Sequence, residues 1–165
     1  MRNIAEDLKS ANHKYQAKVI SKRIITEATL DDDLRHKFNI KAVADEPTGD
    51  TTEPLLYEVK IVHIADGQPI QFEERWVDAR RVPHFMEQDF SRVNTSDYLI
   101  EKIPLERGSY TIQALAAPVD IANALQIEQA SPTLVLSRKT FSAGQVLTVV
   151  KMWHAGDRYQ FAGEL

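Results

Sequence analysis

Two segments of this chain have the pattern of a long β-hairpin, and they constrain the fold more than any other feature. The first covers residues 55–78, where two runs rich in Val, Ile and aromatic residues flank Asp66-Gly67. Asp-Gly is a favoured two-residue hairpin turn. The second covers residues 132–154 and turns at residues 142–145. Because strands joined by tight turns run antiparallel, the sequence predicts an antiparallel sheet.

The remaining segments predict short helices and further strands. Helices are expected from Asn3 as N-cap, from Thr29 as N-cap, at residues 85–88, at residues 96–102, and from Pro118 to Leu125. Strands are expected at residues 15–26 and 110–116, residues 158–161 should close the sheet, and residues 45–54 form a polar loop prone to disorder. Strands outnumber helices, which favours the α+β class: an antiparallel β-sheet flanked by helices.

Length and charge exclude several classes of function. A chain of 165 residues fits one domain. The net charge of −4 argues against nucleic-acid binding by these residues, since phosphate contacts need a basic face. The absence of cysteine excludes disulfides and thiolate metal sites, and the His residues lack metal-ligand spacing. No apolar run approaches the roughly 20 residues of a membrane span, so we expect a cytoplasmic protein.

Polar side chains recur at every second position of the first hairpin. Residues of one parity share a face of a strand, so Gln71, Glu73 and Arg75 lie on one face. The turn at Asp66-Gly67 places His63 near the pairing partner of Ile70 or Gln71, on the same face. The opposite face is apolar except for Glu74, which fits only if the register shifts or the strand is bulged there.

The second hairpin follows the same logic. Arg138 shares a face with Leu134, Leu136 and Thr140, and His154 shares a face with Thr148, Val150 and Met152. Burying Arg138 is costly unless it is paired or bound to a ligand. Its planar guanidinium suits carboxylates and phosphates, because it can make two parallel hydrogen bonds.

Simpler explanations exist for these residues. Glu73 and Arg75 on one strand are most often an exposed charge pair, and a lone His in a strand is most often structural. The chain has no Gly-rich phosphate loop and no Gly-x-Ser-x-Gly nucleophile elbow. The residues themselves therefore support a polar-lined pocket in an α+β domain.

Five segments, taken in order along the chain, resemble a known family. They are residues 3–8, 62–77, 82–90, 136–141 and 156–161, including Ile-Ala-Asp-Gly-Gln-Pro-Ile-Gln-Phe-Glu-Glu-Arg-Trp-Val and Gly-Asp-Arg-Tyr-Gln-Phe. Together they resemble the ligand-sensing UTRA domain of GntR-type transcription regulators, and within it the histidine-utilisation repressor branch. Residues 78–80 and 93–98 depart from that branch, which affects ligand details more than the fold.

The resemblance implies a chorismate-lyase-like fold with an effector pocket on one sheet face, and homodimerisation. Full-length members carry an N-terminal winged helix-turn-helix that binds operator DNA. We expect residues 1–165 to be a single UTRA domain that lacks this DNA-binding domain.

The resemblance also implies a set of ligand-binding positions. Backbone N–H groups of Asn3, Ile4 and Ala5 would face an anionic group at a helix start. His63 matches a basic position where sugar-phosphate sensors tend to carry Arg. The remaining predicted positions are Glu73, Arg75, Tyr98, Arg138, Thr148 and His154.

We therefore expect a repressor domain that senses urocanate, histidine or a related imidazole, without catalytic residues or a cofactor. The helix start and Arg138 would hold the carboxylate, while Glu73 with His154 or His63 would bind the imidazole. One alternative is a UTRA sensor for another ligand, such as an amino-sugar phosphate. Another is a lyase acting on a chorismate-like acid, since the resemblance implies a shared fold.

Overall fold

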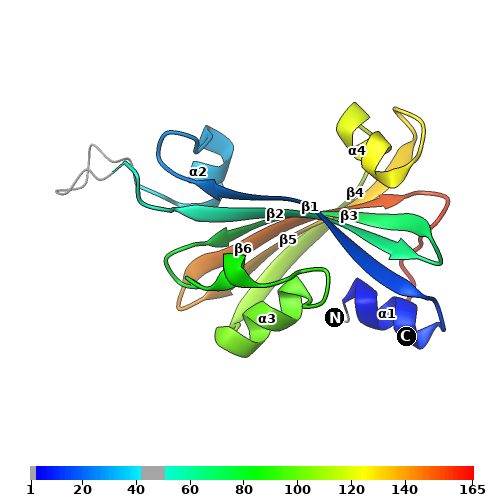
Figure 1. Cartoon of the computed structure of the whole chain (residues 1–165), viewed down its shortest axis with the longest axis horizontal. Coiled ribbons are helices and arrows are strands. Elements are labelled where there is room, and N and C mark those ends of the chain that lie inside the picture. Colours follow the sequence, from blue (N-terminus) through cyan, green and yellow to red (C-terminus); the bar gives the residue numbers. More distant parts are fainter. Residues whose placement is uncertain (1–2, 42–50) are drawn as a thin grey trace.

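One antiparallel sheet forms the centre of the molecule. The computed structural model describes residues 3–41 and 51–165 (Figure 1). Within these residues, six strands pair in the order β1-β2-β3-β6-β5-β4. They are β1 (Tyr15–Ile25), β2 (Leu56–Ala65), β3 (Gln68–Asp78), β4 (Arg107–Ala116), β5 (Pro132–Ser142) and β6 (Gln145–Ala155). The predicted hairpins β2–β3 and β5–β6 are confirmed, and β3 pairs with β6 to join them.

Helices cover both faces of the sheet. They are α1 (Ile4–Ser10), α2 (Asp32–Phe38), the 3₁₀ helix η2 (Phe85–Glu87), α3 (Thr95–Lys102) and α4 (Val119–Leu125). Figure 1 shows α1 and α3 on one face, and α2 and α4 on the other. This arrangement confirms the predicted α+β class. None of the helices in the described ranges has the length and apolar character needed to cross a membrane.

Side-chain caps fix where α1 and α2 begin. Asn3 Oδ1 accepts from Glu6 N at 2.9 Å, as predicted. The prediction that Thr29 caps the second helix is wrong: Asp31 Oδ1 accepts from Leu34 N at 2.7 Å, so α2 begins at Asp32. Thr29 Oγ1 instead accepts from Thr26 N in the preceding turn.

Two other predicted boundaries are wrong. Pro118 is the N-cap of α4 and not its first helical residue, because its extended ψ of 162° lies outside the helix. Residues 158–161 form no strand: β6 ends at Ala155, and Arg158 N closes a turn onto Ala155 O. The predicted loop at residues 45–54 lies largely outside the described residues.

The apolar face of the sheet accommodates Glu74 without a change of register. Glu74 pairs regularly with Lys60 on β2 and Lys151 on β6. Its Oε1 accepts from Trp153 Nε1 at 2.8 Å, and its Oε2 lies 3.9 Å from Lys60 Nζ. Hydrogen bonding and charge pairing thus satisfy this carboxylate, so neither the register shift nor the bulge expected at Glu74 is needed.

The opposite face carries the polar residues and is partly covered by helices. Val59 and Ile61 of β2 pack with Phe85 of η2 and Leu99 of α3 in one apolar cluster. Ile4 and Leu8 of α1 pack against Ala65 and Ile70 at the other end of the β2–β3 hairpin. Helices α1 and α3 therefore leave the polar side chains of β3, β5 and β6 between them.

Gly156 lies where the C-terminal segment (residues 156–165) leaves the sheet. A Cβ added there would lie 2.9 Å from the backbone O of Pro132. We expect Gly156→Ala to lower the free energy of unfolding by about 1–3 kcal/mol, because the backbone must shift. Urea unfolding followed by tryptophan fluorescence measures this change. Gly163→Ala is the matched control, because its Cβ meets nothing within 4 Å; equal stability of the two variants would contradict the close packing at Gly156.

Candidate functional site

A cavity of about 920 Å³ lies on the face of the sheet that carries α1 and α3. Strand side chains form its floor, and α1 and the C-terminal segment contribute to its walls. The lining residues used below are Asn3, Ile4, Gln71, Glu73, Arg75, Ser96, Leu136, Arg138, Met152, His154, Tyr159 and Phe161.

Strand register arranges the floor in three rows. Gln71 lies opposite His154, which lies opposite Leu134. Two residues further along come Glu73, Met152 and Leu136, and two further come Arg75, Val150 and Arg138. Because alternate residues share a face, all three rows point to the same side of the sheet. The predicted pairing of His63 is also confirmed: its partner is Gln71.

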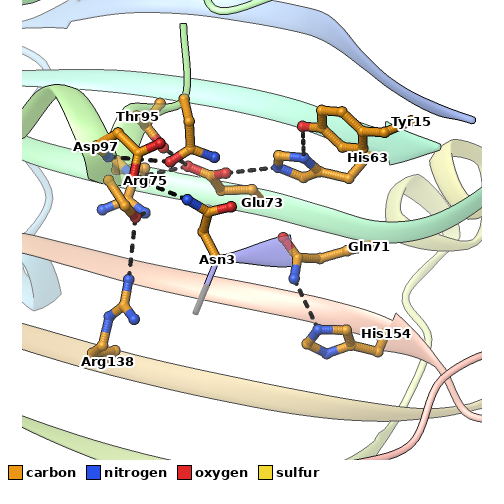
Figure 2. A network of polar contacts seen from close by, with 12 residues as sticks. Asn3, Tyr15, His63, Gln71, Glu73, Arg75, Thr95, Asp97, Arg138 and His154 are labelled. Atoms are coloured by element: carbon orange, nitrogen blue, oxygen red, sulfur yellow. Dashed lines mark hydrogen bonds and ion pairs between the residues drawn. The ribbon is translucent and has the colours of Figure 1, made fainter. Parts of the chain in front are cut away.

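A buried carboxylate, Glu73, organises the centre of the site (Figure 2). Its Oε2 accepts from Arg75 Nε and from Thr95 Oγ1, both at 2.7 Å. Its Oε1 lies 2.7 Å from His63 Nε2. Glu73 is only 3% exposed and Arg75 only 2%. The simpler explanation, an exposed charge pair, is therefore wrong.

Burial and ion pairing have opposite effects on Glu73. Burial acts to raise its pKa, but the charge of Arg75 and the hydrogen bonds from His63 and Arg75 outweigh burial, so the pKa lies well below its usual value. Glu73 is thus an ionised acceptor that already has three donors. A general acid must carry a proton near neutral pH, so Glu73 is poorly suited to that role.

His63 lies behind Glu73. Its Nδ1 is 2.7 Å from the hydroxyl of Tyr15, and the two rings stack with centroids 5.9 Å apart. Burial and the charge of Glu73 raise the pKa of Tyr15, so its hydroxyl is protonated and can donate to Nδ1. His63 lines a smaller cavity of about 130 Å³ next to the large one. From this place it orients Glu73.

Two guanidinium groups meet at one end of the large cavity. Arg75 Nη2 and Arg138 Nη2 both donate to Ser96 Oγ, at 3.0 and 3.3 Å. Arg75 Nη1 also donates to Thr148 Oγ1 at 3.2 Å. Burial, and then the charge of Arg75, lower the pKa of Arg138 to about 10, which leaves it charged at neutral pH. Arg75 and Arg138, called here the cationic pole, outweigh the single charge of Glu73.

The other end of the cavity carries Gln71 and His154, called here the amide pole. His154 Nδ1 lies 3.0 Å from the backbone O of Leu134, and His154 Nε2 lies 2.9 Å from Gln71 Nε2. Burial lowers the pKa of His154 to about 4, so the ring is neutral at physiological pH. Tyr159 stacks on this ring at 4.5 Å, and Phe161 meets it edge-on at 5.1 Å.

Comparison with known proteins shows which family this chain belongs to. Residues 10–160 match the sequence model of one family, described as the UTRA domain. The chain belongs to the UTRA domain family.

Curated relatives of this UTRA domain are named as repressors, not enzymes. The histidine utilization repressor of Pseudomonas putida is 30% identical over 161 residues, which are 98% of this chain and 60% of the relative. The histidine utilization repressor of Klebsiella aerogenes is 27% identical over 164 residues, or 99% and 62%. The chain spans about three fifths of the length of these relatives.

Solved structures share the fold of this UTRA domain. The C-terminal domain of the histidine utilization repressor from Pseudomonas syringae pv. tomato str. DC3000 has a TM-score of 0.80 at 24% identity, covering 92% of this chain and 99% of that chain. PhnF from Mycobacterium smegmatis has a TM-score of 0.82 at 17% identity, covering 100% and 68%. A GntR-family regulator from Enterococcus faecalis V583 has a TM-score of 0.66 at 17% identity, covering 93% and 100%.

The UTRA cavity brings together six of the predicted ligand-binding residues: Asn3, Ile4, Glu73, Arg75, Arg138 and His154. Ala5 and His63 line the smaller cavity instead. Tyr98 packs in the apolar core, 5.9 Å from the ring of Phe85, and Thr148 holds Arg75. Direct ligand contact by any of these residues remains a prediction.

Four residues that line the cavity are not among the predicted ligand-binding positions: Gln71, Ser96, Tyr159 and Phe161. Strand parity did place Gln71 on the polar face, so a signal existed for it. Tyr159 and Phe161 were missed because their segment was predicted to be a strand. Ser96 was assigned to a helix, and nothing in the sequence indicated that this helix meets the sheet at two arginines.

Burial of His154 predicts a pH dependence of stability. The folded-state pKa of about 4 lies below the unfolded value of about 6.5. As pH falls from about 6.5 towards 4, the unfolded chain gains a proton that the folded chain excludes, so stability falls by up to about 1.4 kcal/mol per pH unit. Above pH 6.5 this contribution is constant.

His154→Asn isolates this effect, because Asn retains a donor for Leu134 O and cannot titrate. Urea unfolding between pH 4.5 and 7.5 should give a shallower dependence for this variant than for the wild type. Parallel curves for the two proteins would contradict the neutral, buried state of His154.

Proposed function

We propose that this UTRA domain senses urocanate or a closely related imidazole carboxylate, as the effector domain of a GntR-family repressor of histidine utilisation. The observation that carries the proposal is the two-ended cavity, with a cationic pole at one end and the neutral amide pole at the other. The names of the curated relatives agree with this ligand class.

The carboxylate of the ligand binds at the cationic pole. Arg138 lines the cavity beside Arg75, whose guanidinium is already engaged by Glu73, Thr148 and Ser96. Arg138 is the second cation at this end of the cavity, and its guanidinium can make a charge-assisted hydrogen bond to an anion. The start of α1 lies against the same cavity through Asn3 and Ile4, whereas Ala5 lines the smaller cavity.

The planar ring of the ligand binds at the amide pole. Aromatic rings prefer offset stacked or edge-to-face contacts, and Tyr159 and Phe161 provide such surfaces around His154. Leu136 and Met152 form an apolar floor between the two poles. A flat molecule with a ring at one end and an anion at the other matches this arrangement.

Effector binding controls DNA binding through a homodimer, with the operator contacted by an N-terminal domain outside this chain. Strand β4 is one of the two edge strands of the sheet and is exposed along nearly its whole length, with Tyr110 and Ile112 among its exposed side chains. An exposed edge strand can pair with a second copy. The effector must bind the two dimer arrangements with different affinities to shift the equilibrium between them. The repressor acts in the cytoplasm, where its operator lies.

An amino-sugar phosphate is the second candidate ligand. The two adjacent guanidinium groups and the volume of about 920 Å³ favour it, because phosphate carries more charge than carboxylate and a sugar is larger than urocanate. A lyase activity is disfavoured because Glu73 is held ionised and lacks the proton of a general acid.

Calorimetric titration of the domain tests the ligand class. We expect urocanate to bind with micromolar affinity, about −8 kcal/mol, and more tightly than histidine or glucosamine 6-phosphate. Arg138→Gln should weaken urocanate binding by about 10-fold or more, because it removes a charge-assisted hydrogen bond worth about 1.5–3 kcal/mol.

Arg92→Gln is the matched control, because the Arg92 side chain is 86% exposed and does not line the large cavity. It should leave the affinity unchanged. Tight binding of the sugar phosphate without binding of urocanate would overturn the ligand class, and equal losses in both variants would overturn the role of Arg138.

A further inference from the structure

We propose that the side-chain carbonyl of Gln71 is the specificity-determining acceptor of the cavity. It selects ligands that present an N–H group at the end opposite to their anion. This inference rests on the proposed function, since it names the group of the imidazole carboxylate that the site recognises.

Hydrogen bonding fixes which way the Gln71 amide points. The backbone O of Leu134 can only accept, so the proton of His154 lies on Nδ1. The neutral ring then has a lone pair on Nε2, which accepts a hydrogen bond. Gln71 must therefore direct its NH₂ group to His154, which leaves its Oε1 on the other side of the amide.

The Oε1 atom of Gln71 is a buried acceptor that lacks a donor. Gln71 is 4% exposed and lines the large cavity. Among the residues that the structure describes, no group donates to this oxygen. A buried polar atom without a partner costs about 1–3 kcal/mol, so a small shift of the Gln71 amide towards the cavity, which lets a ligand N–H reach Oε1, recovers that energy.

Neighbouring groups hold the amide pole in place before a ligand arrives. The ring of His154 is covered by Tyr159 and Phe161. Arg158 anchors the same segment by donating to the backbone O atoms of Pro69, Leu125 and Gln126 at 3.1, 2.7 and 3.0 Å. An acceptor fixed in this way discriminates strongly, because it cannot turn to satisfy itself when the ligand lacks an N–H.

The carboxylate on the floor, Glu73, competes less well than Gln71 for the ligand N–H, because three of its roughly four acceptor positions are already used. Glu73 already receives hydrogen bonds from His63, Arg75 and Thr95. The rows of Gln71 and Arg138 lie four residues apart along the strands, about 13 Å at the backbone. A carboxylate at Arg138 therefore directs the far end of an elongated ligand towards Gln71.

A pair of ligands isolates the contribution of the N–H group. Urocanate and 3-(2-furyl)acrylate are both planar and share the acrylate, but the furan ring has an oxygen and no N–H. We expect the wild-type domain to prefer urocanate by about 10- to 100-fold, the equivalent of one satisfied buried acceptor. Gln71→Met has similar length and only a weakly accepting thioether, and should reduce this preference to less than about threefold, with furylacrylate affinity retained.

Two controls separate recognition from folding. Gln16→Met changes an exposed glutamine on β1 that lines neither cavity, and should keep the wild-type preference. N-methylated urocanates lack the ring N–H and should bind the wild-type domain as weakly as furylacrylate, which tests the inference even if Gln71→Met does not fold.

Each outcome of these titrations decides between explanations. An unchanged preference in Gln71→Met, or tight binding of the N-methylated ligands, overturns the role of Gln71 and leaves the proposed function intact. Loss of both ligands in the folded variant shows a structural role instead. If the wild-type domain binds neither acid, the proposed function fails and this inference falls with it.

Discussion

The ion pair between Glu73 and Arg75 is the interaction on which the site depends. A charge can be buried only if it is paired and its remaining hydrogen-bonding capacity is satisfied. Here His63 and Thr95 make further hydrogen bonds to the carboxylate of Glu73, and the guanidinium of Arg75 donates to Thr148 and Ser96. These partners come from β2, β6 and α3, so one buried pair ties the sheet to the helix that borders the cavity.

The three donors around Glu73 also determine how the cavity can recognise a ligand. Three donors use most of the roughly four acceptor positions of this carboxylate, and Arg75 is held by its own partners. Recognition therefore passes to side chains on either side of this pair: Arg138 at one end and Gln71 with His154 at the other. The same polar network that stabilises the fold thus gives the cavity its two chemically different ends.

Strand alternation made much of this predictable from sequence. The turn at Asp66-Gly67 fixes the register of β2 and β3, so His63 could be placed opposite Gln71 and beside Glu73. The burial of these side chains could not be predicted in the same way. Whether Glu73 is buried depends on α1 and α3, which come from distant parts of the chain. The C-terminal segment was predicted as a strand, and its turn after Ala155 depends on packing against Pro132 and on the contacts of Arg158.

A crystal structure of the domain with urocanate is the most direct test of this account. We predict that the carboxylate contacts Arg138, that the ring N–H lies within hydrogen-bonding distance of Gln71 Oε1, and that Glu73 keeps its bonds to His63, Arg75 and Thr95. A ligand bound in the opposite direction, or one that displaces a partner of Glu73, would contradict the claim that this buried, ion-paired carboxylate organises a two-ended site.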